Sequence, residues 1–212
     1  MRSADTAASY IIAKRALDLL GGLVLLTFFL PILVVVAVLI RCDTRGPIFF
    51  CQQRLGIRGQ PFELWKFRTL REGSGAPSHD LLSVDDPRIT SVGGLLRSWG
   101  IDELPQLWNV LKGQMSLVGP RPAPLYHLDQ YTSFQRKRLL AKPGLTGWAI
   151  THGRNAIPWE ERIQLDVWYV ENGSLLLDLK ILVKSVYVVL SRKGVYGPSG
   201  VNDTFGDFPH GS

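Results

Sequence analysis

Two neighbouring carboxylates, Asp102 and Glu103, stand directly before Leu104 and Pro105. Proline is tolerated only in the first turn of a helix, so we expect Asp102 at or beside an N-cap and Glu103 in the first turn. This position has an ordinary structural explanation, because acidic side chains are favoured at helix N-termini. It also presents a carboxylate beside a site that attracts phosphate. One carboxylate could then attack a phosphorus atom while its neighbour holds a metal ion.

Several basic residues are candidates for binding phosphate. A guanidinium fork matches phosphate oxygens, and an arginine between two prolines loses little entropy when it binds. Any one of these side chains is more often a solvated surface charge, but together they predict a site for a multiply charged ligand. The basic candidates are Arg97, Arg121, Arg154, Lys66 and Arg68, and Arg121 is the one held between two prolines, Pro120 and Pro122.

Other kinds of site are excluded or weakly indicated. The sequence contains no phosphate-binding loop of the GxxxxGK[ST] type, no GxGxxG fingerprint, no HExxH and no GxSxG elbow, and its histidines lack ligand spacing. Asp85 and Asp86 could form a second metal site, although a turn before Pro87 explains them better. We expect Cys42 and Cys51 to be free thiols in a reducing cytoplasm.

The chain must position these groups beside a membrane. It has 212 residues, a net charge of +6 and 46% hydrophobic residues, with no charge between Leu19 and Ile40. About 22 residues match a hydrocarbon core of about 30 Å. The segment ends at Ile40-Arg41 without a cleavage site, which disfavours a signal peptide. Basic residues flank both ends and Pro31 lies inside, so either a re-entrant hairpin bent at Pro31 or a kinked spanning helix is expected.

The remaining residues predict one predominantly helical α+β domain. A β-hairpin is expected around a turn at Gly56–Gly59, a loop at Glu72–Pro87, and a helix that buries Leu104, Leu107, Trp108 and Leu111 and ends at Gly113. Further helices are expected at Tyr126–Leu140, Trp159–Val170 and Leu175–Leu190, either interfacial and amphipathic or simply core helices. The expected division is a membrane segment at 1–41, a catalytic domain at 42–196 and a flexible tail at 197–212.

Several sequence blocks jointly resemble the small monotopic phosphoglycosyl transferases, which are bacterial sugar transferases. The resemblance covers about Tyr10 to Tyr196. The blocks are GPIFFCQQRLG, FELWKFRT, DDPRITSVGGLLRSWGIDELPQLWNVLKGQMSLVGPRP, KPGLTGWAITHGRN and LDVWYVENGSLLLDLKIL. Leu30, Gly100 and Gln114 stand where relatives often carry Ser, Ser and Asp, and none of these departures touches the acidic pair.

The resemblance implies an enzyme that moves a sugar-1-phosphate from a UDP-sugar to polyprenyl (undecaprenyl) phosphate and releases UMP. It implies that Asp102 is the nucleophile of a covalent aspartyl phosphosugar intermediate and that Glu103 binds Mg²⁺. It maps the phosphate-binding and positioning residues onto Arg97, Pro120, Arg121, Pro122 and Arg154. It also implies a re-entrant hairpin bent at Pro31, on the cytoplasmic face of the bacterial inner membrane, and downstream glycosyltransferases that use the product.

Three alternatives differ from this interpretation. A membrane-anchored adaptor would use Asp102 only as a cap and the arginines only to bind anionic lipid. A nucleic-acid binder would account for the pI near 9.5, but no nucleic-acid-binding motif is present, and anionic lipid explains the basic charge. Direct attack by the polyprenyl phosphate in a ternary complex would leave Asp102 orienting the metal. The sequence does not identify the sugar.

Overall fold

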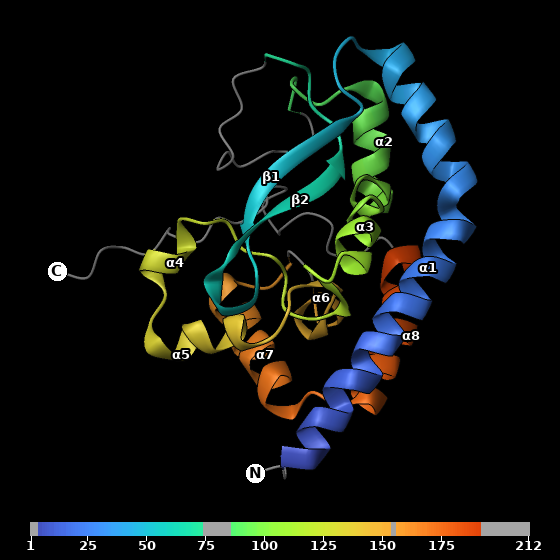
Figure 1. The fold of residues 1–212 in the computed structure, drawn as a ribbon. Helices are drawn as coiled ribbons and strands as arrows, with labels where there is room; N and C mark the ends of the chain where they lie inside the picture. The colour runs from blue at the N-terminus through green and yellow to red at the C-terminus, as the bar shows by residue number, and fades with distance from the viewer. Residues whose placement is uncertain (1–3, 74–85, 154–155, 192–212) are drawn as a thin grey trace, which may run out of the picture.

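A computed structural model describes residues 4–73, 86–153 and 156–191, with one long helix along one side of a mixed domain (Figure 1). The helices are α1 (Ala4–Asp43), α2 (Ser91–Trp99), α3 (Gln106–Leu111), α4 (His127–Gln130), α5 (Ser133–Arg136), α6 (Trp148–Thr151), α7 (Trp159–Asn172) and α8 (Leu175–Ser191). The strands are β1 (Phe49–Leu55), β2 (Pro61–Phe67), β3 (Ser116–Val118) and β4 (Gly144–Thr146). Short 3₁₀ turns are η1 (Ile57–Gly59), η2 (Ile101–Glu103) and η3 (Lys137–Leu140).

Helix α1 is continuous through Pro31 over 40 residues, a length of about 60 Å. Figure 1 shows it bowed and not folded back on itself, so the hairpin expected at Pro31 is not confirmed. Loss of one backbone hydrogen bond at a proline bends a helix without ending it when packing holds both halves. Here Val36 and Ile40 are buried against Phe67 and Leu96.

The amino-terminal part of α1 is fixed to the domain by polar contacts. Asp18 is buried and accepts hydrogen bonds from Ser116 Oγ (2.8 Å) and from the Leu117 backbone N–H (2.9 Å). Arg15 donates to the last carbonyls of α3, and Lys14 forms a 2.9 Å ion pair with the fully buried Asp178 of α8. Helix α1 therefore lies lengthwise against the domain along most of its length.

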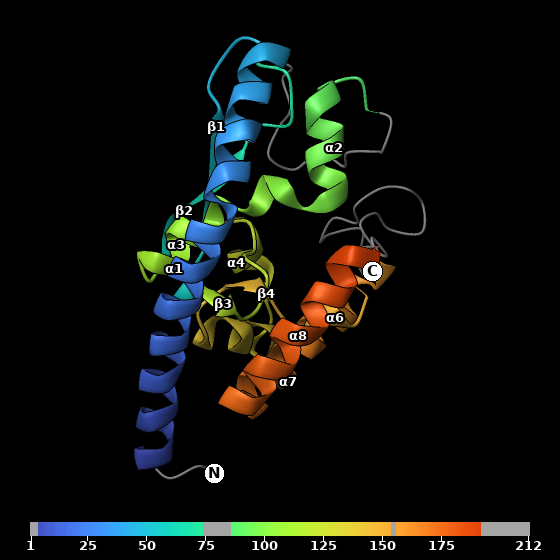
Figure 2. The same ribbon diagram turned by 90° about the vertical axis from the view of Figure 1, so that its right-hand side faces the viewer.

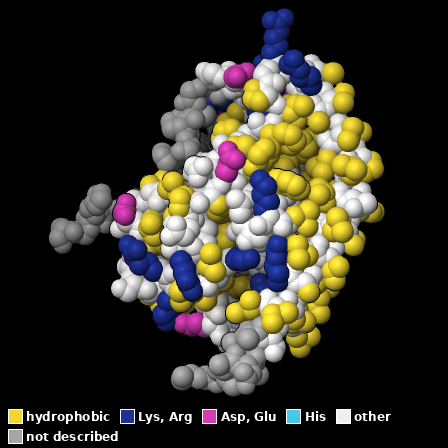
Figure 3. Space-filling view, viewed as in Figure 1, with side chains coloured by type: hydrophobic (Ala, Val, Ile, Leu, Met, Phe, Trp, Pro, Cys, Tyr) yellow, Lys and Arg dark blue, Asp and Glu magenta, His cyan; other side chains and the backbone are white. Residues whose placement is uncertain are grey.

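The opposite face of α1 is apolar and exposed. Ser9–Asp43 is long and apolar enough to cross a membrane by length and composition. Figure 3 shows hydrophobic side chains gathered over this helix. Helix α8 adds an exposed stripe at helical spacing, and Figure 2 shows α1 and α8 on the same side of the molecule. The stripe consists of Leu176, Leu179, Val183, Val186, Tyr187 and Leu190.

Strands β1 and β2 form the expected antiparallel hairpin around η1. Asn109 of α3 holds this hairpin, because its side chain accepts from the Trp65 N–H (3.2 Å) and donates to the Glu63 carbonyl (2.7 Å). Phe62 and Leu64 pack beside Leu107 and Val110 in the largest core cluster. This contact brings β2 next to the turn that carries the acidic pair.

Some expected elements differ from the structure. The segment Tyr126–Leu140 is not one helix: Tyr131 is extended, and Thr132 starts a new helix with a capping box to Gln135. Leu107 is buried as expected, but Trp108 is 47% exposed, and α3 buries Asn109 and Val110 in addition to Leu107. Helix α2 and the parallel pair β3–β4 were not expected. The tail from Gly197 and most of the loop Glu72–Pro87 lie outside the described residues.

The other helices agree with the sequence. Helices α7 and α8 coincide closely with the predicted Trp159–Val170 and Leu175–Leu190. Gly113, with φ of 80°, follows the end of α3 as expected. Cys42 and Cys51 are free and exposed.

Candidate functional site

The acidic pair lies in η2, between α2 and α3. Gly100 ends α2 with φ of 70°, a left-handed conformation that glycine adopts without strain, and the chain then turns sharply into Ile101–Glu103. The expected N-cap position is wrong, because Pro105 occupies it and no side chain caps α3. The Asp102 carboxylate therefore has no capping role that would explain its presence.

The two carboxylates have opposite environments. Asp102 is only 9% exposed and accepts no hydrogen bond from any described residue, and burial raises its pKa to about 6 against the attraction of Lys66. Glu103 accepts from Lys66 Nζ (2.9 Å) and from Arg121 (2.8 Å). Burial opposes ionisation of Glu103 as well, but Arg121 and Lys66 outweigh it and hold its pKa well below the usual range. The neighbours thus push the two pKa values apart.

Lys66 and Arg97 approach the pair from two different elements. Lys66 projects from β2, while Arg97 lies in the last turn of α2, and both cations favour ionised Asp102. The Arg97 Nε is buried and has no hydrogen-bond partner among the described residues. Arg97 therefore keeps a donor that is not used by the described residues beside the acidic pair.

The Pro-Arg-Pro segment is held by its backbone. The Pro120 carbonyl accepts from the Gly144 N–H (2.8 Å), next to the β3–β4 pair. The Arg121 carbonyl accepts from Arg138 (3.0 Å), which is itself buried in a 2.5 Å ion pair with Asp166. These contacts fix the backbone of the Pro-Arg-Pro segment, from which the Arg121 side chain extends to Glu103.

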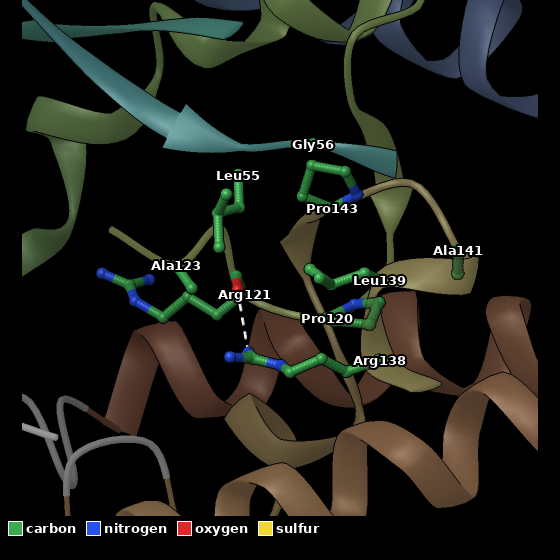
Figure 4. Close-up of a pocket in the computed structure, with 9 residues that line it drawn as sticks. All are labelled: Leu55, Gly56, Pro120, Arg121, Ala123, Arg138, Leu139, Ala141 and Pro143. Atoms are coloured by element: carbon green, nitrogen blue, oxygen red, sulfur yellow. Dashed lines mark hydrogen bonds between the residues drawn. The ribbon is translucent and has the colours of Figure 1, made fainter. Parts of the chain in front are cut away.

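Figure 4 shows the Arg121 guanidinium directed away from the other residues that line a small pocket. That pocket is lined by Leu55, Gly56, Pro120, Arg121, Ala123, Arg138, Leu139, Ala141 and Pro143. Its walls do not include the acidic pair. It therefore supports the Pro-Arg-Pro segment from behind and does not contain the candidate reacting groups.

Two predicted site residues are not brought to the acidic pair. Arg68 is buried and donates to the carbonyls of Thr44 and Arg45 just beyond α1, so its hydrogen bonds stabilise the end of that helix. Arg154 lies outside the described residues. Asp85 also lies outside them, and Asp86 accepts from the Arg88 N–H and side chain in a turn, as expected.

The donor set at the pair fits Mg²⁺. Magnesium prefers oxygen ligands and is commonly held by one or two carboxylates together with substrate phosphates. Glu103 Oε1 is occupied by Lys66 and Arg121, whereas Oε2 has only a 3.4 Å contact with Arg121. Glu103 Oε2 would therefore hold the ion, which would supply positive charge to a diphosphate. No group of three or more possible ligands occurs among the described residues, so the remaining ligands would come from substrate and water.

The sequence reasoning missed Arg54. This half-buried residue of β1 comes near Arg121 because the Leu55 N–H donates to the Ala123 carbonyl (2.8 Å). The only sequence signal was the position of this charged residue, directly before the buried end of a strand and a glycine turn. It belongs to the block GPIFFCQQRLG, in which no single residue stood out.

A family model described as bacterial sugar transferase matches residues 9–192. An uncharacterized sugar transferase, EpsL, of Bacillus subtilis is 46% identical over 87% of this chain and 91% of its own length. An undecaprenyl-phosphate galactose phosphotransferase of Salmonella typhimurium is 38% identical over 86% of this chain and 41% of its own length. A UDP-N-acetylgalactosamine-undecaprenyl-phosphate N-acetylgalactosaminephosphotransferase of Aeromonas hydrophila is 37% identical over 87% and 45%. The chain spans less than half the length of these last two relatives.

Proposed function

The chain belongs to the bacterial sugar transferase family and is a sugar-phosphate transferase, and on this basis we propose that it transfers a sugar-1-phosphate from a UDP-sugar to polyprenyl phosphate. UMP is released, and the product is a polyprenyl-diphosphate sugar. This is the first membrane step of glycoconjugate synthesis, and glycosyltransferases would extend the product. Membership of an enzyme family sets aside the adaptor and the nucleic-acid binder.

The observation that carries the proposed mechanism is the state of Asp102. Its carboxylate is buried, accepts no hydrogen bond from the described residues and lies among the cations Lys66, Arg97 and Arg121. An ionised carboxylate that is largely buried and not held by hydrogen bonds from neighbouring side chains is a more reactive nucleophile than one in water. Glu103 differs, because two cations already hold it in place.

In the first half-reaction, an Asp102 carboxylate oxygen attacks the β-phosphorus of the UDP-sugar. The new Asp–O–P bond forms as the P–O bond to the α-phosphate breaks, and UMP leaves with the bridging oxygen and its electron pair. In the second, a phosphate oxygen of polyprenyl phosphate attacks the same phosphorus and regenerates the carboxylate. Lys66, Arg97 and Arg121 neutralise the charge that develops on phosphate oxygens. Two steps allow a water-soluble donor and a membrane-bound acceptor to use one nucleophile in turn.

We further propose that the chain is monotopic and lies on the cytoplasmic face of the inner membrane. Helix α1 lies lengthwise on the domain and buries polar groups such as Asp18 beneath it. If α1 crossed the bilayer steeply, the polar groups packed beside it would enter hydrocarbon, at a high free-energy cost. An orientation close to the membrane surface instead inserts only the exposed faces of α1 and α8.

The test is to trap the intermediate. The protein is incubated with Mg²⁺ and a UDP-sugar without acceptor, quenched, and examined by peptide mass spectrometry while UMP is measured. We expect a sugar-phosphate mass on the peptide that contains Asp102, one UMP per adduct, and loss of the adduct on addition of polyprenyl phosphate. UMP released only when the acceptor is present, with no adduct, would instead support direct attack in a ternary complex.

A further inference from the structure

The candidate site holds more positive than negative charge. Lys66 and Arg121 share the single carboxylate of Glu103, and Arg97 has an unpartnered Nε. Arg54 adds another guanidinium, which donates to the neutral side-chain oxygen of Gln52 at 3.2 Å and 2.6 Å. It forms no ion pair with any residue that the structure describes.

The backbone places Arg54 beside Arg121. The Leu55 N–H donates to the Ala123 carbonyl at 2.8 Å, and Arg54 itself forms an antiparallel bridge with Pro124. Burial and the like charge of Arg121 lower the pKa of Arg54 to about 10. Arg121 shares the Glu103 carboxylate with Lys66, and Arg54 has no carboxylate partner among the described residues, so the two partly dehydrated guanidiniums form a favourable place for a further anion.

The sheet register adds that Arg54 and Lys66 project from one face of the hairpin. Lys66 pairs with Phe50, and Phe50, Gln52 and Arg54 alternate along β1. Directly paired residues share a face, and so do residues two apart on a strand. The cations therefore extend along the hairpin from Lys66 past Glu103 to Arg54. This row of positive charge is longer than a single phosphate group requires.

The two ends of this row of cations differ in their position relative to α1. Figure 1 shows the β1–β2 hairpin on the side of α3 that faces away from α1. If α1 lies in the membrane, the hairpin side faces the water from which a soluble nucleotide arrives. Strand β1 starts near the carboxyl-terminal end of α1. Arg54 lies at the other end of this strand, next to the turn of the hairpin.

We propose that Arg54, together with Arg121, binds the phosphate of the nucleoside monophosphate that leaves in the first half-reaction. This inference rests on the proposed function and adds a residue that the family comparison does not assign. As the bond between the β-phosphorus and the bridging oxygen breaks, the departing α-phosphate gains a negative charge. The Arg54 guanidinium donates hydrogen bonds to that phosphate, and the proton count does not change.

The test measures binding of UMP by isothermal titration calorimetry to the full chain in detergent. Arg54→Gln should weaken UMP binding at least tenfold, and Arg54→Lys, which keeps the charge but loses the fork, should weaken it less. Arg58→Gln is the matched control, because Arg58 is an exposed arginine in the adjoining turn, and it should bind UMP within twofold of wild type. Arg54→Lys serves in place of Arg54→Gln if the latter does not fold.

A second measurement separates the two half-reactions. Arg54→Gln should slow UMP release from UDP-sugar, whereas transfer from preformed adduct to polyprenyl phosphate should keep its wild-type rate. If both Arg54 variants bind UMP as tightly as the wild type does, and the wild type is active, the role of Arg54 is overturned and the proposed function stands. Wild-type protein that releases no UMP from any UDP-sugar would overturn the proposed function, and the role of Arg54 with it.

Discussion

Replacing Asp102 by asparagine should abolish turnover and, at the same time, stabilise the fold. The ionised carboxylate is buried without a hydrogen bond from the described residues, so its charge is unfavourable in the native state. Asparagine has the same size and imitates the neutral acid. The variant therefore removes the proposed nucleophile together with an energetic cost of folding.

The size of the effect follows from the pKa. A rise in the pKa of Asp102 from 3.8 to about 6 corresponds to about 3 kcal/mol of destabilisation once the group is ionised. Between these two values the native protein binds more protons than the unfolded chain, so wild type loses stability as the pH rises through 6. The asparagine side chain of the variant does not titrate, and the stability difference should grow from near zero at pH 4 to about 3 kcal/mol at pH 8.

The assay is denaturant unfolding in detergent micelles, followed by tryptophan fluorescence at pH 4, 6 and 8, with UMP release measured on the same samples. Glu103→Gln is the matched control, because it neutralises the adjacent carboxylate. It should destabilise the protein at pH 8 by about 1 to 3 kcal/mol, since Lys66 and Arg121 lose their partner and the Glu103 side chain is only 20% exposed. Asp102→Asn that is no more stable than wild type at pH 8 would refute the reasoning.

Three further outcomes are expected. The rate of UMP release should fall as the pH decreases through about 6, because the proposed nucleophile must be ionised; a fall only near pH 4 would contradict its raised pKa. Gly93→Ala should lower the Tm by about 2–10 °C, because a Cβ there meets the Thr69 backbone, while Gly94→Ala, whose Cβ makes only an ordinary contact with Ile89, should not lower it. Asp166→Asn should cost about 3–5 kcal/mol in urea unfolding and reduce activity, because it leaves the buried Arg138 charge uncompensated beneath the Pro-Arg-Pro segment; unchanged stability would mean that the pair is not structural.

Local patterns were sufficient for several elements. The apolar run, the glycine turn of the hairpin, and helices α7 and α8 follow from periodicity and turn residues that act over a few positions. Helix α2 was missed because Gly93 and Gly94 weaken its helical signal. The interrupted segment from Tyr126 to Leu140 was missed because a single threonine cap outweighed the basic amphipathic pattern.

Residue types and their order were enough to establish the family, the acidic pair, and the arginine between prolines. They did not establish which carboxylate is held and which is free, because this depends on Lys66 and Arg121, which lie 37 and 18 positions from Glu103 along the chain. Tertiary structure also assigned Arg68 to the end of α1 and brought Arg54 to the candidate site. Burial and charge act through space, so they are fixed only once the chain has folded.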